Sequence, residues 1–223
     1  MLFRSQLDLY SLNLDARVHI GSIGTIGGTA LHQRNQSLGM KHPVPNYSQF
    51  NLGAFAYAEQ EIVADVRATA ALRYDTRAMD IAERRRSDSA RSIINEAVSR
   101  SFTVTQAAVG FVWKPTSDFS TSLNISSGWR APVAAELFSV GRDEGEIQYR
   151  VGNSNLRPER ARNIEFAARY HSAHLVGDLT FFRQEIADYI YAVPTGATKE
   201  NVPEYVYTQN NALLSGEIGR AHV

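Results

Sequence analysis

Cysteine is absent from the chain, and this excludes several classes of protein at once. Disulfide scaffolds, thiolate metal sites and enzymes with a cysteine nucleophile all require that side chain. An excess of charge of one sign is also absent, because 23 lysines and arginines balance 23 aspartates and glutamates. A dedicated nucleic-acid-binding protein is expected to be basic, so the sequence predicts no nucleic-acid partner.

Long hydrophobic runs are missing too, since no stretch approaches the roughly 18 consecutive apolar residues of a spanning helix. This does not exclude a membrane protein, because spanning β-strands show only a weak alternation of apolar and polar residues. The composition, with 43% hydrophobic and 10% aromatic residues among 223, is that of a folded chain. It indicates one large domain or two small ones rather than a disordered or fibrous protein.

Alternation of apolar and polar residues with a period of two is the main pattern, and it indicates β-strands. In one example, Leu123 and Ile125 oppose Asn124 and Ser126. A soluble β-sandwich alternates in the same way, so the pattern alone does not decide which face meets lipid. It predicts nine strands, roughly at residues 5–18, 23–34, 46–59, 63–77, 101–114, 119–131, 161–171, 175–192 and 204–214.

The predicted connections alternate between short and long. Short turns fall near residues 21–22, 60–61, 115–118 and 172–173, and long loops near 35–45, 78–100, 132–160 and 193–203. Short turns at one end and long loops at the other are typical of an outer-membrane barrel. Several strands also reach the roughly ten residues that a tilted strand needs to cross a bilayer. The predicted fold is therefore all-β, as part of a transmembrane up-and-down antiparallel β-barrel.

Candidate catalytic or metal-binding residues are few. No HExxH motif, nucleophile elbow or Ser-His-Asp order occurs, so the sequence predicts neither an enzyme nor a cofactor. His32 and His42 flank the predicted loop 35–45 and are weak candidates for contact with a metal or haem. Solvated loop histidines are the favoured alternative.

The predicted loop 78–100 carries five arginines, Arg84, Arg85 and Arg86 among them, and four acidic residues, so it is nearly neutral. A solvated loop is the favoured interpretation, and contact with an anionic ligand or a lipopolysaccharide phosphate is the alternative. The spacing of apolar residues over 89–98 also predicts a short helix in this loop.

One segment carries a more specific pattern. Ser127-Gly128-Trp129-Arg130-Ala131-Pro132 is followed by Glu136-Leu137-Phe138 and then by Gly152-Asn153-Ser154-Asn155-Leu156-Arg157-Pro158-Glu159. This resembles the TonB-dependent outer-membrane receptors. That family often reads Gly-aromatic-Arg-Ala-Pro, then Glu-Leu, then Gly-Asn-x-x-Leu-x-Pro-Glu, across a strand end, a loop and the next strand start. Similarity to the family's barrel strands extends over most of residues 5–215.

Physical chemistry gives these motif residues a role in the barrel itself. Pro132 ends a strand because it cannot donate to the ladder, and Arg130 on the polar face is expected to find an interior partner. Gly152 and Asn153 supply turn chemistry, and Pro158 breaks structure before the next strand. We interpret the whole set as architecture rather than ligand contacts: Gly128, Trp129, Arg130, Ala131, Pro132, Glu136, Leu137, Gly152, Asn153, Leu156, Pro158 and Glu159.

The resemblance implies a 22-stranded barrel plugged by an N-terminal domain, of which this chain supplies about nine strands. Such receptors take up scarce nutrients, such as ferric siderophores, haem or cobalamin, with energy delivered by the TonB complex. The implied partners are outer-membrane lipid, the TonB complex through the plug, and a small ligand such as an iron chelate. The implied location is the outer membrane of a Gram-negative bacterium.

The sequence itself shows no plug, signal peptide or terminal aromatic strand, so we expect a piece of a longer protein. Residues 1–216 are expected to form the partial barrel domain. One reverse translation of residues 217–223 matches a common sequencing adapter, so these seven are expected not to belong to the protein. A passive outer-membrane channel and a secreted all-β binding or adhesion module remain the alternatives.

Overall fold

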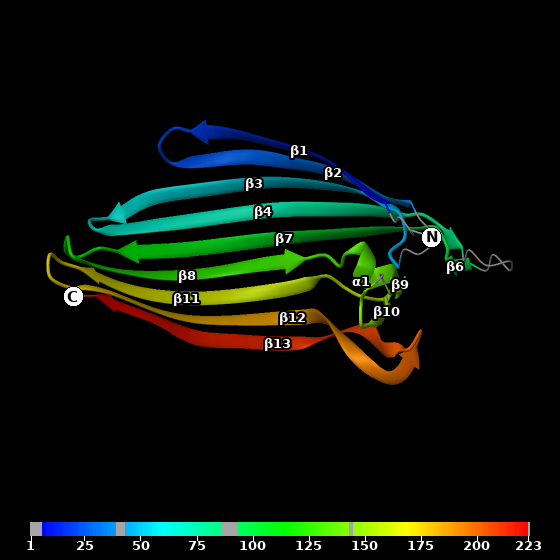
Figure 1. Cartoon of the computed structure of the whole chain (residues 1–223). Helices are drawn as coiled ribbons and strands as arrows, with labels where there is room; N and C mark the ends of the chain where they lie inside the picture. Colours follow the sequence, from blue (N-terminus) through cyan, green and yellow to red (C-terminus); the bar gives the residue numbers. More distant parts are fainter. Residues whose placement is uncertain (1–5, 39–42, 86–92, 143–144, 223) are drawn as a thin grey trace.

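The chain folds mainly into one large, curved and mostly antiparallel sheet (Figure 1). A computed structural model describes residues 6–38, 43–85, 93–142 and 145–222. In this part of the chain the sheet has 11 strands, in the order β1-β2-β3-β4-β7-β8-β11-β12-β13-β10-β9. Its long strands are β1 (Gln6–Ile20), β2 (Gly24–Leu38), β3 (Tyr47–Val63), β4 (Val66–Ile81), β7 (Val98–Trp113), β8 (Phe119–Arg130), β11 (Glu159–His171), β12 (Val176–Lys199) and β13 (Val202–His222).

These nine long strands follow one another in sequence and in space, each antiparallel to the next. The all-β, up-and-down antiparallel prediction is thereby confirmed. Each predicted strand is present, with its ends moved by at most four residues except that β12 and β13 end seven and eight residues later than predicted. β13 runs on to His222, and residues 217–222 pair with β12. That pairing does not reveal the origin of these residues, so the adapter interpretation stays a prediction.

The connections lie at two opposite ends of the sheet. Four short turns gather at one end, at residues 21–23, 64–65, 114–118 and 172–175. The loops between β2 and β3, β4 and β7, and β8 and β11 gather at the other, which we call the loop end (Figure 1). A long loop at 193–203 was predicted wrongly. β12 and β13 instead continue as a hairpin whose turn residues Glu200 and Asn201 both have positive φ, 48° and 62°, as a tight hairpin turn requires.

The long connections contain small elements of their own. β5 (Arg84–Arg85) pairs with β6 (Ile93–Asn95), so the helix predicted over 89–98 is wrong for its described part, residues 93–98. Two adjacent β-branched residues, Ile93 and Ile94, favour a strand there. The loop 131–158 holds a five-residue helix, α1 (Ala134–Phe138), and the strands β9 (Val140–Gly141) and β10 (Tyr149–Val151). Among the described residues, no helix is long and apolar enough to cross a membrane.

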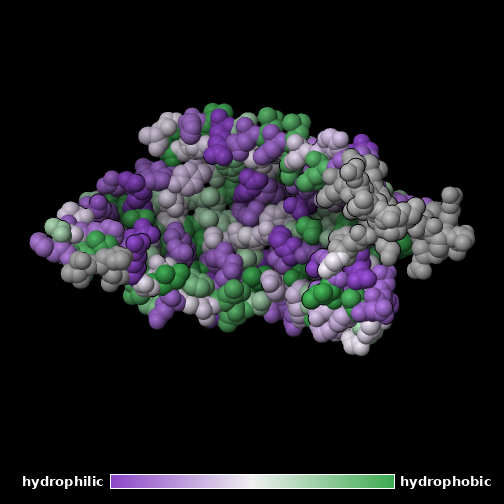
Figure 2. Space-filling view, in the orientation of Figure 1, coloured by the Kyte–Doolittle hydropathy of each residue, from purple (hydrophilic) through white to green (hydrophobic). Residues whose placement is uncertain are grey.

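The two faces of the sheet differ in chemistry. Successive side chains of a strand point to opposite faces, and paired residues share a face. The convex outer face is apolar, with large hydrophobic residues left exposed, among them Leu12, Leu72, Val109, Phe111, Leu123, Ile125, Ile164, Phe166 and Phe181. Hydrophilic side chains gather in the hollow of the opposite, concave inner face (Figure 2).

In the described part of the chain, both hydrophobic clusters of buried residues lie at the loop end, where the loop 131–158 folds over the inner face. One cluster joins Met79 and Ile81 of β4 to Ala134 of α1. A second joins Leu137 of α1, Leu156 and Ile190 of β12. Over the rest of the sheet, no other described segment forms a second layer against which side chains could be buried.

Candidate functional site

A network of charged and polar side chains crosses the middle of the inner face. Arg73 of β4 lies 2.6 Å from Asp75 and donates a hydrogen bond of 2.9 Å to Thr29 of β2. Asp75 also accepts a hydrogen bond of 2.7 Å from Gln106 of β7. The ring of Phe55 of β3 lies 5.9 Å from the Arg73 guanidinium. Side chains of β2, β3, β4 and β7 are therefore in contact across the hollow.

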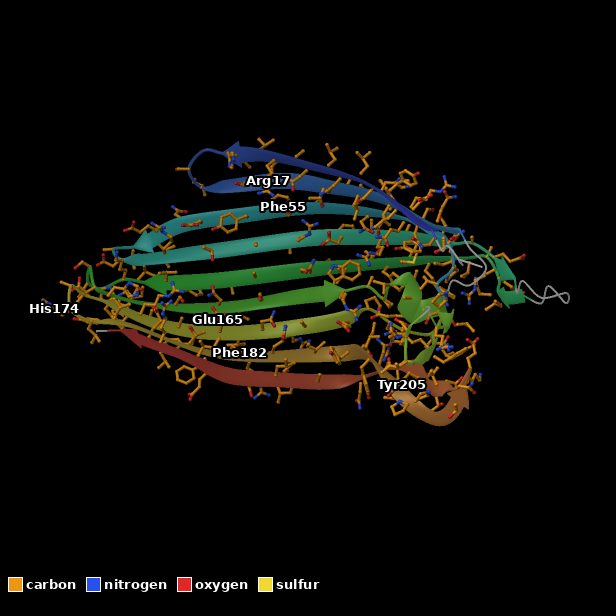
Figure 3. The ribbon with its side chains drawn as sticks, viewed as in Figure 1. Arg17, Phe55, Glu165, His174, Phe182 and Tyr205 are labelled. Carbon is orange, nitrogen blue, oxygen red and sulfur yellow. The ribbon has the colours of Figure 1, made fainter. Side chains whose placement is uncertain are left out.

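Phe55 also links this network to β1. The guanidinium of Arg17 lies 5.9 Å from the centre of the same ring, and Figure 3 shows both residues near the first strands of the sheet. Two cations over one aromatic ring are favourable because the ring faces carry negative charge density. Arg17, Phe55, Arg73, Asp75 and Gln106, from neighbouring strands, therefore form a continuous wall of interacting side chains along the inner face.

A groove of about 380 Å³ runs along this wall toward the loop end. Its lining includes Asn51, Arg77, Gln106 and Arg130, so both cationic and neutral hydrogen-bonding groups face it. Arg77 donates a hydrogen bond of 3.1 Å to Asn51. The groove is suited to hold a polar segment or a polar solute rather than a hydrocarbon.

Arg130, the last residue of β8, lines that groove at the loop end and bridges two carboxylates. It makes a two-pronged contact with Glu159 of β11, at 3.0 and 2.6 Å, and a second ion pair with Glu136 of α1 at 2.9 Å. Glu159 also accepts a hydrogen bond from the Ile190 backbone, and Glu136 one from Val133. One guanidinium thereby fastens β8, β11 and the loop helix together.

The remaining motif residues hold the loop 131–158 onto the sheet. Ala131 and Pro132 are almost fully buried. Gly152 lies so close to α1 that a Cβ atom would meet the Leu137 and Phe138 backbone at 2.5–2.7 Å. Asn153 donates through its backbone to Glu136 and through its side chain to the Tyr207 carbonyl of β13. Leu156 closes the second core cluster.

Arg84 ties three loops together at the loop end. Its guanidinium donates to the carbonyls of Pro43 and Val140, which belong to the loops before β3 and after α1. Burial lowers the pKa of this guanidinium, while the neighbouring Tyr149 raises it. In the β12–β13 hairpin, Lys199 lies 2.8 Å from Glu204, and the hydrogen bonds from Lys199 and Thr195 lower the pKa of that carboxyl group.

Of the two histidines singled out from the sequence, only His32 lies within the described residues. His32 lies inside β2, which continues to Leu38, and it pairs in register with Leu12 and Phe50. It therefore points to the outer face, away from the polar groove. His42 lies outside the described residues. No group of three or more potential metal-binding His, Asp or Glu side chains occurs in the described part of the chain. The proposed ligand contact of His32 and His42 remains untested.

Sequence reasoning missed the Arg73–Asp75–Gln106 network and the bridging role of Arg84. The only signal for the network was the recurrence of charged residues on the polar side of each strand. Which of them meet depends on the pairing register, because a shift of one residue would turn each side chain to the other face.

The comparisons with known proteins agree with this architecture. A family model described as TonB dependent receptor-like, beta-barrel, matches residues 4–221. The copper transporter OprC has a TM-score of 0.77 at 17% identity, with 97% of this chain covering 36% of that one. The Serratia marcescens haemophore receptor HasR, solved as a double mutant with HasA and haem, has a TM-score of 0.72 at 13% identity. The match covers 97% of this chain and 39% of HasR.

A mutant of the ferric enterobactin receptor PfeA from Pseudomonas aeruginosa, solved with enterobactin, has a TM-score of 0.63 at 17% identity. The match covers 96% of this chain and 33% of PfeA. At these identities the structural likeness shows the fold alone. The chain belongs to the TonB-dependent receptor β-barrel family, whose members are outer-membrane transporters rather than enzymes. It spans between 33% and 39% of the length of these three solved structures.

Proposed function

We propose that this chain is part of the barrel wall of an outer-membrane receptor that takes up a scarce nutrient, an iron complex such as a ferric siderophore or haem. The observation that carries the proposal is the opposite chemistry of the two faces. The outer face leaves Leu12 72% exposed and Phe166 42% exposed, which is unfavourable in water but suits hydrocarbon. The inner face carries the wall of hydrogen-bonded charges.

The inner groove and the loop end supply the surfaces that a receptor needs. The groove from Arg73 to Arg130 presents polar groups to whatever fills the barrel, and in this proposal the plug domain fills it. In this proposal the motif residues around Arg130 hold the loops in place rather than touch the ligand, because their polar side chains are engaged with one another or with the β13 backbone. Ligand contact then falls to the loops at the loop end.

The iron-complex part of the proposal is supported by the neighbours in fold. The three solved neighbours are a copper transporter, a receptor in complex with haem and a receptor in complex with enterobactin, so barrels of this fold serve metal ions or metal-binding compounds. Energy would come from the TonB complex acting through the plug.

Growth of a bacterial strain that lacks its own iron receptors tests this function. The complete receptor gene containing this chain is expressed in that strain, and haem or a ferric siderophore is supplied as the only iron source. Growth that disappears when TonB is deleted supports the proposal. Uptake that persists without TonB would instead identify a passive channel, and secretion of the product in soluble form would identify a binding module.

A further inference from the structure

The inner face differs in chemistry between the first and the second half of the sheet. On β1 to β4 it carries charged side chains that pair within the wall, such as Arg17 with Asp15 at 2.7 Å. The other pairs there are Arg67–Glu59 at 3.0 Å and Arg73–Asp75 at 2.6 Å. On β8, β11 and β12 the inward side chains are mostly small or neutral, and they include Ser122, Asn124, Ser126, Asn163, Thr180 and Gln184.

Glu165 is the single charged residue in the middle of this neutral surface. It lies on the inner face of β11 between Arg130 at the loop end and Arg169 at the end with the short turns. In register it pairs with Asn124 and Phe182, and Figure 3 labels Glu165 and Phe182 midway along the sheet. Its side chain is exposed, and among the described residues no cation pairs with it. The surface therefore carries one free negative charge.

The neutral side chains around Glu165 have hydrogen-bonding groups to spare. Ser126 accepts a hydrogen bond of 3.3 Å from Asn163. Ser122, Asn124 and Gln184 have no side-chain hydrogen-bond partner within the described part of the chain. Conduction requires sites that bind favourably enough for a solute to enter and weakly enough for it to leave. Exposed hydroxyl and amide groups meet this requirement better than a fixed ion pair does.

A glycine keeps this part of the inner face flat. A Cβ atom at Gly110 of β7 would meet the Asn124 amide oxygen and the Thr69 hydroxyl oxygen, each at 2.6 Å, so both side chains lie over the glycine. The flat region adjoins the polar groove of about 380 Å³, because Gln106, which lines the groove, is followed on the inner face of β7 by Ala108 and Gly110. A polar strip thus runs from the loop end toward the short turns.

We infer that the solute crosses the barrel along the inner face of β8, β11 and β12, which we call the neutral track, and that this track favours a polar cargo without net negative charge. Its unpaired hydroxyls and amides replace part of the hydration shell of the solute. The carboxylate of Glu165 attracts a cation and repels an anion, because no counter-charge in the wall neutralises it. This assignment rests on the transport function proposed above and adds the side of the lumen and the charge of the cargo.

Thiol reagents can test the path without knowledge of the cargo, because the chain has no cysteine. In the complete receptor, with any cysteine elsewhere replaced, Ser122→Cys and Asn124→Cys each place a thiol on the neutral track. Thr25→Cys is the matched control, a hydroxyl residue on the inner face of β2 that pairs with His19 and Tyr57. The probes are two methanethiosulfonates, one with a trimethylammonium group and one with a sulfonate group. Heat-modifiable migration in gels verifies that each variant is folded.

Labelling is measured in iron-starved cells supplied with haem and a ferric siderophore, with and without TonB. Both track thiols are expected to react several-fold faster when TonB is present, whereas the rate at Thr25→Cys should not change. At Asn124→Cys the cationic reagent should be preferred over the anionic one, relative to their reactivities with a free thiol. Glu165→Gln should lower this preference by about threefold or more, because the carboxylate lies on the adjacent strand directly opposite. Glu165→Asp, which keeps the charge, should retain the preference.

Equal acceleration at Thr25→Cys and at the track thiols would overturn the neutral track, as would no acceleration at the track thiols in cells whose growth depends on TonB. An unchanged reagent preference in Glu165→Gln would overturn the charge selection. Growth that does not require TonB would refute the proposed uptake function instead. In that case, faster labelling of the track thiols than of Thr25→Cys still supports the track as the path of a passive channel, and equal labelling refutes it.

Discussion

Arg130 shows how one side chain can fasten three segments that are far apart in sequence. Its two carboxylate partners are held in place by backbone donors, so the guanidinium meets a prepared acceptor set. The side chains of Glu136 and Glu159 are only 13% and 11% exposed, whereas that of Arg130 is 41% exposed. Loss of the contact therefore costs most free energy at the two carboxylates, which would be left buried without their cation, rather than at the arginine.

Replacing Arg130 by alanine is expected to lower the free energy of unfolding of the complete barrel by about 1–3 kcal/mol, allowing for the partial exposure of the arginine. Urea denaturation in detergent micelles measures the change. In a Glu136→Gln/Glu159→Gln background the same replacement should cost clearly less, because neutral amides do not require a cation. An equal cost in both backgrounds would show that the ion pairs are not the source of the effect.

Gly152 and Gly128 form a matched pair within one motif. A Cβ atom at position 152 would meet backbone atoms of α1, whereas one at position 128 would have nothing within 4 Å. Gly152→Ala should therefore separate the loop 131–158 from the sheet and increase its cleavage by a protease added to whole cells. Gly128→Ala should leave the cleavage rate unchanged, and equal rates for the two variants would contradict the packing described here.

At the scale of the element, alternation along a strand determines which side chains meet which environment. Leu123 lies on the outer face of β8 and its neighbour Asn124 on the inner face, with Phe111 and Gly110 of β7 as their respective partners. Neither face is closed by a second layer at this level. Neighbours in sequence are therefore separated by the full thickness of the sheet.

Single labelled cysteines test this separation, and the absence of native cysteine makes the labelling specific. In vesicles, a fluorophore at Leu12, Ala70, Leu123 or Phe166 is expected to be quenched by a lipid-soluble quencher. A label at Asn124 should respond instead to a water-soluble quencher that enters the barrel. Strong quenching of all five labels by the aqueous reagent would favour a protein that does not sit in a bilayer.

On the scale of the whole molecule, the sheet is curved but open. β1 forms one edge, and β13 forms the other over most of its length, since β10 covers only Glu204, Tyr205 and Val206. Unpaired strand edges beside an exposed apolar face promote association with other chains. Closure into a barrel would satisfy both edges at once.

The 223-residue chain by itself is therefore expected neither to transport nor to fold stably in aqueous buffer. Refolded without detergent, it should elute as aggregates in size-exclusion chromatography and show no cooperative thermal transition. A soluble monomer with a sharp melt would contradict both this prediction and the assignment of the apolar face to lipid.

The amino-acid sequence by itself determined the nine strands, their antiparallel order and the family, because alternation and turn residues are local properties and the motif from Gly128 to Glu159 is specific. It did not determine that 193–203 forms a strand extension, nor that Arg130 bridges Glu136 and Glu159. Only the tertiary structure decided which face is apolar and exposed, and which arginines meet a carboxylate. Those properties depend on pairing register and sheet curvature, which join residues far apart in the chain.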